Sequence, residues 1–270
     1  MAALRFILRA EPEQRLDLSP LVPERLAKLS QAEIERLPLG TTRAPALVGD
    51  VFRVAMGEAN EVRIEGGSPR FDGLGEGMAS GMLVLEGDAG SRAGRQMRGG
   101  RLEVRGNAGH WAASGMQGGG IEIAGDCGDF LGGPLAGEVE GMAGGSVVVR
   151  GSAGARTGDR LRRGLIVVEG RAGELVASRL IAGTVAICGG AGAMPGSLMR
   201  RGTVLLGGAV PELLPTFVPL DEAEGGVFRA LLARALAPLS PAAAALATAP
   251  ARRFGGDMAS LGKGEILVAG

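Results

Sequence analysis

Short runs of alternating hydrophobic and polar residues recur through the middle of this chain. Each run has two aliphatic positions separated by one residue, and a glycine stands on either side of it. Alternation with a period of two is typical of a β-strand that buries one face. Seven runs are present, with aliphatic pairs Leu83 and Leu85, Leu102 and Val104, Ile121 and Ile123, Val147 and Val149, Ile166 and Val168, Val185 and Ile187, and Val204 and Leu206.

The glycine that opens each run recurs at a fixed spacing. Gly81, Gly100 and Gly119 are evenly spaced, a longer step leads to Gly145, and the original step then returns. Such repetition indicates a solenoid, in which each unit buries its apolar stripe only by stacking on its neighbours. The opening glycines are Gly81, Gly100, Gly119, Gly145, Gly164, Gly183 and Gly202, and the repeat units span 75–87, 94–106, 113–125, 139–151, 158–170, 177–189 and 196–208.

A repeat of this length must turn back on itself to bring the next strand alongside in parallel. We therefore predict a mainly β fold, a right-handed parallel β-helix of about seven coils with like residues stacked on like. The opening glycines are predicted to be structural corners, where the backbone has positive φ or passes close to another segment. Cys127 occupies one position of a ladder of alanines just after each unit, so we interpret it as a core residue and not as a reactive thiol.

The segments outside the repeat have other patterns. We predict three parts: an N-terminal strand and helix cap at 1–61, the β-helix at 62–210, and a C-terminal helix and tail strand at 211–270. The N-terminal signals are an apolar stretch at 3–9, Ser19-Pro20 as a helix start, and a Ser30–Glu33 capping box before a helix at 31–37. The C-terminal signals are apolar residues at helical spacing in 222–237, an Ala/Pro-rich stretch at 238–250 that suggests loose order, and a strand at 265–269.

Composition and charge narrow the function. Glycine makes up 49 of 270 residues and tyrosine is absent, so the core must be aliphatic. The formal net charge is zero, which argues against a nucleic-acid or membrane-surface partner. Two cysteines are too few for a disulfide scaffold, and the N-terminus is neither a signal peptide nor a membrane span, so we expect a cytoplasmic protein.

The units read G-x-x-M-x-x-G-x-L-x-V-x-G followed by D/N-A-G, and the tail reads GKGEILV at 262–268. This pattern resembles the C subunit of formylmethanofuran dehydrogenase over about 62–210. The same family includes the corresponding subunit of a formyltransferase/hydrolase complex in methylotrophic bacteria, which the composition favours, and its fold is shared with the C-terminal domain of glutamate synthase.

The resemblance implies a non-catalytic scaffold subunit of a one-carbon enzyme complex. The other subunits would transfer formyl groups between a tetrahydromethanopterin-type cofactor and a methanofuran-like carrier and release formate. This chain alone would bind no cofactor. Two alternatives stay open: a subunit of a redox formylmethanofuran dehydrogenase, and a glutamate-synthase-like protein of ammonia assimilation. A carbohydrate-acting β-helix would need a groove of carboxylates that the sequence lacks.

Candidate catalytic and metal-binding residues are few. His110 is the single histidine, which excludes a multi-histidine metal site. Asp129 follows it by one repeat step, so stacking would place the two side chains about 5 Å apart. We interpret this as a structural pair and not as a catalytic dyad, and we predict no catalytic residue and no metal ligand in this chain.

Arginines are the more informative charged residues. The register places Arg98, Arg162 and Arg200 in one column of turns. They are either part of a solvated, ion-paired turn face or a site for carboxylates on a partner or carrier, which the guanidinium fork suits.

The outward positions of the later strands are apolar, including Leu165, Val167 and Leu205. An exposed apolar stripe needs a cover, either the helix at 222–237 or another subunit. We predict these three residues as the partner face.

Overall fold

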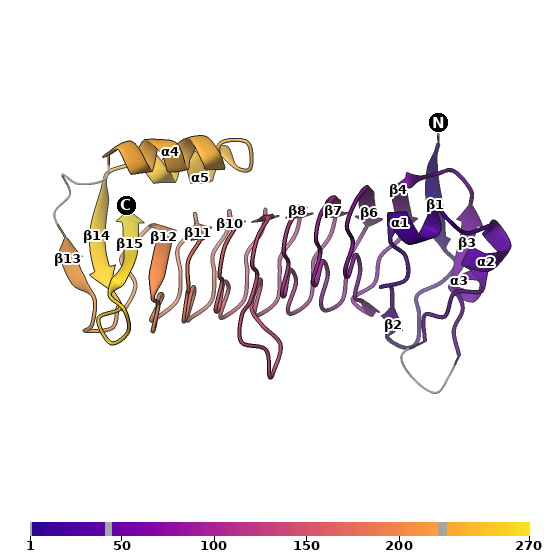
Figure 1. The fold of residues 1–270 in the computed structure, drawn as a ribbon, viewed down its shortest axis with the longest axis horizontal. Coiled ribbons are helices and arrows are strands. Elements are labelled where there is room, and N and C mark those ends of the chain that lie inside the picture. Colours follow the sequence, from indigo (N-terminus) through magenta and orange to yellow (C-terminus); the bar gives the residue numbers. More distant parts are fainter. Residues whose placement is uncertain (1, 41–44, 221–225) are drawn as a thin grey trace.

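A mostly parallel sheet of 13 strands dominates the molecule (Figure 1). The computed structural model describes residues 2–40, 45–220 and 226–270. In Figure 1 the chain winds in successive turns along the long axis, and each turn adds one strand to the sheet. The parallel strands are β4 (Glu58–Glu65), β6 (Met82–Glu86), β7 (Arg101–Val104), β8 (Gly120–Ile123), β9 (Ser146–Val149), β10 (Leu165–Val168), β11 (Thr184–Ile187) and β12 (Arg201–Gly207).

The strands stack in the register that the glycine spacing predicts. Leu83 pairs with Leu102 and Leu102 with Ile121, so one repeat along the chain equals one step across the sheet. The register survives the longer step, since Ile121 pairs with Val147. The extra residues form a loop that projects from the stack between β8 and β10 in Figure 1.

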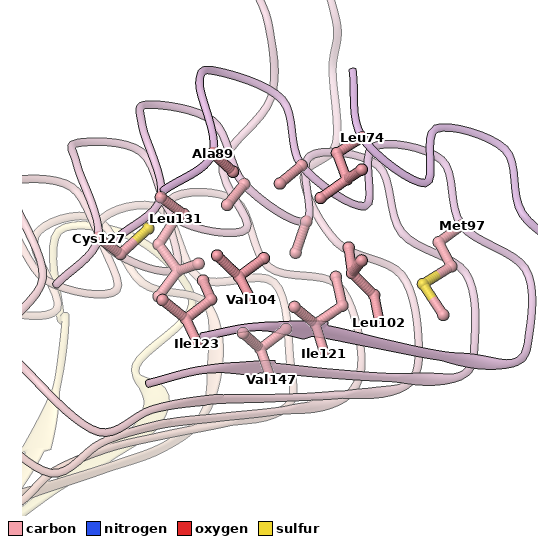
Figure 2. Close-up of a cluster of buried hydrophobic side chains, with 14 of the residues drawn as sticks. Leu74, Ala89, Met97, Leu102, Val104, Ile121, Ile123, Cys127, Leu131 and Val147 are labelled. Atoms are coloured by element: carbon pink, nitrogen blue, oxygen red, sulfur yellow. The ribbon is translucent and has the colours of Figure 1, made fainter. Parts of the chain in front are cut away.

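A second parallel ladder runs on the opposite side of the turns. It consists of single bridges from Ala89 through Ala108 and Cys127 to Ala191. The space between this ladder and the strands is filled by aliphatic side chains, of which Leu102, Val104, Ile121 and Ile123 are labelled in Figure 2. Small residues in the ladder let the two sides approach, because a larger side chain there would be repeated at every turn.

All seven opening glycines have left-handed backbone angles, with φ from +78° to +114°. At Gly164 a Cβ would lie 2.8 Å from the carbonyl oxygen of Gly145 and 2.8 Å from the terminal methyl of Met142. Close approach and left-handed φ thus coincide there, and both favour glycine.

The N-terminal part closes one end of the sheet. β1 (Ala3–Leu8) lies between β4 and the antiparallel edge strand β3 (Phe52–Ala55), while β2 (Leu16–Asp17) pairs with β5 (Phe71–Asp72). Three short helices cover this end: α1 (Pro23–Leu26), α2 (Gln31–Glu35) and α3 (Val48–Val51).

The two predicted helix starts in this part had different outcomes. The capping box is confirmed, because Glu33 Oε2 accepts from the Ser30 amide at 2.8 Å and from the Ser30 hydroxyl at 2.7 Å. The helix start at Ser19-Pro20 is wrong. The Ser19 amide donates to Asp17 Oδ1 at 3.0 Å, which holds the segment in a turn, and the helix begins at Pro23.

The C-terminal part closes the other end. β15 (Lys263–Ala269) continues the sheet in parallel beside β12, followed by antiparallel β14 (Ala251–Gly256) and β13 (Val218–Leu220). Helices α4 (Gly226–Leu236) and α5 (Pro241–Thr248) lie over the C-terminal end of the sheet (Figure 1). The prediction of loose order at 238–250 is wrong, since most of that stretch is α5. The first residues of the helix predicted at 222–237 lie outside the described residues.

Candidate functional site

A group of arginines surrounds a hollow of about 280 Å³ in the turns that precede β10 and β12. Regular backbone bonds between turns fix their positions: the Arg162 amide donates to the Met142 carbonyl at 2.9 Å, and the Arg200 amide to the Leu180 carbonyl at 2.7 Å. The hollow is lined by Arg162, Arg163, Arg200 and Arg201, with Ile181, Ala182 and Leu261 between and beside them.

These arginines differ in their partners. Arg162 forms an ion pair with Glu140 at 2.6 Å. The side chains of Arg163, Arg200 and Arg201 are exposed and have no hydrogen-bond or ion-pair partner within the part of the chain that the structure describes. Of the predicted column, the structure brings Arg162 and Arg200 to one hollow. Arg98 lies three turns from Arg162, about 14 Å away at strand spacing, and does not join them.

The predicted partner face needs correction. Val167 is 0% exposed and Leu205 is 1% exposed, because both pack in a cluster with Leu232 and Leu236 of α4 and Ala243 and Ala247 of α5. Only Leu165 is partly exposed. The chain's own C-terminal helices therefore cover the apolar stripe at Val167 and Leu205, and those two residues are not available to another subunit.

His110 and Asp129 do lie together. The Asp129 amide donates to His110 Nδ1 at 2.9 Å, while the Asp129 carboxylate lies 3.7 Å from the same nitrogen. Both side chains are about half exposed. Next to His110, Trp111 stacks on Phe130 with ring centroids 5.5 Å apart. Because Nδ1 already accepts a backbone bond, the contact orders two adjacent turns.

The two cysteines are protected by burial. Burial raises the pKa of the Cys127 thiol from its ordinary value of 9.0 to about 12, and that of Cys188 to about 11. A thiol with such a pKa carries almost no thiolate near neutral pH, so neither side chain is suited to nucleophilic catalysis.

Metal and membrane sites are also missing from the described residues. Residues 2–40, 45–220 and 226–270 contain no group of three His, Cys, Asp or Glu side chains arranged to hold a metal ion. Every helix in these ranges is too short or too polar to cross a lipid bilayer.

Sequence reasoning missed a hollow of about 260 Å³ under the loop between β8 and β9. Its wall contains Asp159, which is 2% exposed and forms an ion pair with Arg179 at 2.9 Å. The longer step after the third unit was the available signal for extra structure here. A second missed feature is a hollow of about 430 Å³ at the C-terminal end, lined by Leu220, Phe228, Met258 and Lys263.

The fold and its turns define a glycine-rich repeat protein of stacked parallel strands, closed at both ends, with an arginine-lined hollow on one edge. No family model matches the chain. Its sequence is 44% identical over 92 residues to the C subunit of the formyltransferase/hydrolase complex Fhc of Methylorubrum extorquens, a match that spans 34% of each chain, about a third of the curated relative's length.

A solved structure extends this likeness to the whole chain. A chain of the crystal structure of the formyltransferase/hydrolase complex (FhcABCD) from Methylorubrum extorquens, in complex with methylofuran, has a TM-score of 0.91 and 41% sequence identity to this protein. The similarity covers 98% of this chain and 99% of that one. The chain belongs to the family of the Fhc C subunit.

Proposed function

We propose that this chain is a non-catalytic scaffold subunit of a cytoplasmic formyltransferase/hydrolase complex. The observation that carries the proposal is the 41% identity to a chain of the FhcABCD complex, with nearly complete coverage of both chains. Because the similarity extends over the whole length, we expect the surfaces that join subunits to be shared as well. The chain would then assemble with other subunits of the complex.

For the fold, we infer a right-handed parallel β-helix at 62–210, between an N-terminal cap at 1–61 and a C-terminal cap at 211–270. The two parallel ladders on opposite sides of the turns support this inference. The handedness rests on the general rule that crossovers between parallel strands are right-handed. Caps at both ends suit the role, because they place the short antiparallel strands β3 and β13 at the two edges of the sheet, where a regular parallel strand would otherwise invite copies of the chain to stack.

We further propose that the catalytic residues of the complex lie in the partner subunits. These would transfer the formyl group between a tetrahydromethanopterin-type cofactor and a methanofuran-like carrier, with release of formate. Support comes from His110, whose Nδ1 accepts a backbone amide, and from Cys127, which is buried. The Asp129 carboxylate lies 3.7 Å from His110 Nδ1, but among the described residues no serine, threonine or cysteine is hydrogen-bonded to His110 as a nucleophile for acyl transfer would be.

For binding, Arg162 and Arg200 are the candidates for contact with carboxylates. Their guanidinium groups can each make two parallel hydrogen bonds to one carboxylate.

The test is reconstitution. The four subunits are expressed together, with and without this chain, and the product is analysed by native mass spectrometry and by assays of formyl transfer and formate release. We expect this chain to co-purify with the others, and its omission to lower the yield of complex. Formyl transfer or formate release by this chain on its own would contradict the scaffold role. Failure of the chain to co-purify with the other subunits would contradict membership of the complex.

A further inference from the structure

The C-terminal end carries a cluster of arginines beside an exposed apolar patch that contains Phe228 and Met258. We propose that Arg163, Arg200 and Arg201, together with this patch, form the docking surface for an acidic, partly apolar peptide segment of a partner subunit. The proposal rests on the proposed function, because it assigns the surface through which the chain would join its complex.

The charge distribution is the first argument. Several arginines of the other turns are neutralised within the chain: Arg95 contacts Glu76 and Glu138, and Arg150 contacts Glu122 and Glu169. Others, such as Arg98 and Arg171, have no side-chain partner among the described residues but do not line this hollow, where three unpaired arginines lie together.

Among the described residues, the acids beside the cluster are already engaged. Glu140 pairs with Arg162, and Glu265 pairs with Arg253 and accepts from the Thr203 hydroxyl. Three neighbouring guanidinium groups with no acidic partner in the described part of the chain repel one another. Because the net charge of the chain is zero, this cluster does not simply reflect an overall basic surface. An acidic partner would relieve this repulsion.

The spacing of the arginines is the second argument. Arg163 and Arg201 are separated by two turns of the stack, with Ala182 between them, and Arg162 and Arg200 flank Ile181 in the same way. Two steps of about 4.8 Å give a separation near 10 Å. In an extended peptide, side chains that point to the same face are two residues apart, at about 6.7 Å. The long arginine side chains can span the remaining few ångströms, so two such carboxylates could contact both sides of the hollow at once.

The apolar patch is the third argument. Leu261 and Arg201 line the arginine hollow, and their chain neighbours Gly262 and Gly202 line the hollow of about 430 Å³, so the two hollows adjoin. That second hollow contains Phe228 and Met258, which are 44% and 51% exposed. Exposed large apolar side chains next to arginines are the composition of a protein interface, and are unusual on a surface that faces water.

The first test uses charge reversal in the co-expressed complex. In the variant Arg163→Glu/Arg200→Glu/Arg201→Glu, we expect recovery of the partner subunits to fall at least tenfold, because three attractive contacts become repulsive. The variant with Gln at all three positions should show an intermediate loss, and a circular dichroism melt checks that each chain is folded.

A matched control reverses three arginines at the opposite end of the molecule, Arg25, Arg36 and Arg53. They are also exposed, with no side-chain partner among the described residues. We expect the control to retain partner recovery within twofold. Equal recovery for both triple variants, with the wild type assembling normally, would overturn the docking surface while leaving the proposed function intact. Failure of the wild type to assemble would instead remove the proposed function.

The second test identifies the occupant. Lys28 and Lys263 are the only lysines in the sequence, and Lys263 pairs with Arg201 across β12 and β15. A carbodiimide joins a lysine amine directly to a carboxylate, so mass spectrometry of the treated complex should find Lys263 bonded to an Asp or Glu of a partner subunit. A bond from Lys263 only to Asp221, Glu222 or Glu224 of this chain, or to a second copy of it, would overturn the proposal.

Discussion

The Ser240 hydroxyl donates a 2.6 Å hydrogen bond to Glu169 Oε1. Ser240 is also the N-cap of α5, where its Oγ accepts from the Ala243 amide at 3.3 Å. Glu169 directly follows β10 and is bound in turn by Arg150 at 2.8 Å, and Arg150 reaches the Leu239 carbonyl at 3.2 Å. A polar contact thus fixes the start of α5 at the margin of the apolar face that α4 and α5 cover.

We predict that Ser240→Ala lowers the free energy of unfolding by about 2 kcal/mol. The variant loses an N-cap, which contributes about 1 kcal/mol, and a hydrogen bond to a charged group, which contributes about 1.5–3 kcal/mol, and the two overlap. Urea denaturation measures the total, and limited proteolysis reports whether 226–248 detaches first. The control is Ser260→Ala, because Ser260 is exposed and, within the described ranges, only its backbone amide forms a hydrogen bond. Equal stability of the two variants would contradict the anchoring role of Ser240.

Leu205→Glu should destabilise this chain by more than about 3 kcal/mol, because the new carboxylate would lie under α4 and α5 without a partner. Leu165→Glu, at a partly exposed position, should cost less than half as much. Thermal melts of the isolated chain compare the two. A Leu205→Glu chain that melts like the wild type would show that the helices do not hold this face in solution.

The stacked strands could be predicted because one local rule repeats. Gly81 and its six equivalents fix the corners, and pairs such as Leu102 and Ile121 repeat at the same offset, so register follows from counting. The loop after the third unit interrupts the count without shifting the register, since Ile121 still pairs with Val147.

The N-terminal and C-terminal parts were harder to predict, because their local sequence signals depend on contacts with residues distant in the chain. Two Ser-Pro pairs are relevant here. The pair at Ser19 does not start a helix, whereas the pair at Ser240 does, with Pro241 as the first residue of α5. Asp17 ties the first Ser-Pro into a turn, whereas alanines with high helix propensity follow the second. The cover over Val167 could not be chosen from the sequence, since an apolar outer face is equally compatible with a helix or a subunit.

Gly164→Val should lower the free energy of unfolding by more than about 2 kcal/mol, through left-handed strain and contact with the Gly145 carbonyl. Gly77→Val is the matched control. Gly77 also has positive φ, at +70°, but apart from its chain neighbours no atom lies within 4 Å of the position that a Cβ would take there. The difference between the two variants in urea denaturation measures the cost of close packing. No difference would contradict the close approach of neighbouring turns.

His110→Ala should leave formyl transfer by the assembled complex near the wild-type rate. Loss of a general base would lower turnover by about 10²–10⁴-fold, whereas loss of the bond from the Asp129 amide costs only about 1 kcal/mol of stability. Turnover per assembled complex is the measurement, with the stoichiometry of the subunits checked by native mass spectrometry. A drop of 10²-fold or more with intact assembly would place catalysis on this chain.

The stability of the chain should fall as pH rises above about 9, with the cysteines responsible for much of the slope. In the unfolded chain the thiols lose their protons near pH 9.0, but burial raises the pKa of Cys127 to about 12 and that of Cys188 to about 11 in the folded chain. Between these values the folded state holds more protons than the unfolded state, so Cys127 costs up to about 1.4 kcal/mol per pH unit. The half-buried Cys188 costs less, because solvent screens its thiolate. Below pH 9 both contributions are constant.

The amino-acid composition lets this pH dependence be assigned largely to the cysteines. Tyrosine is absent and only two lysines are present, so few other side chains titrate between pH 9 and 11. Urea denaturation of the isolated chain at half-unit steps from pH 8 to pH 10.5 should give a falling free energy of unfolding. Cys127→Ala should flatten the slope by up to about 1.4 kcal/mol per pH unit, and Cys188→Ala by a smaller amount. A Cys127→Ala chain with the wild-type slope would mean that this thiol is accessible in the folded state, which would reopen the question of its reactivity.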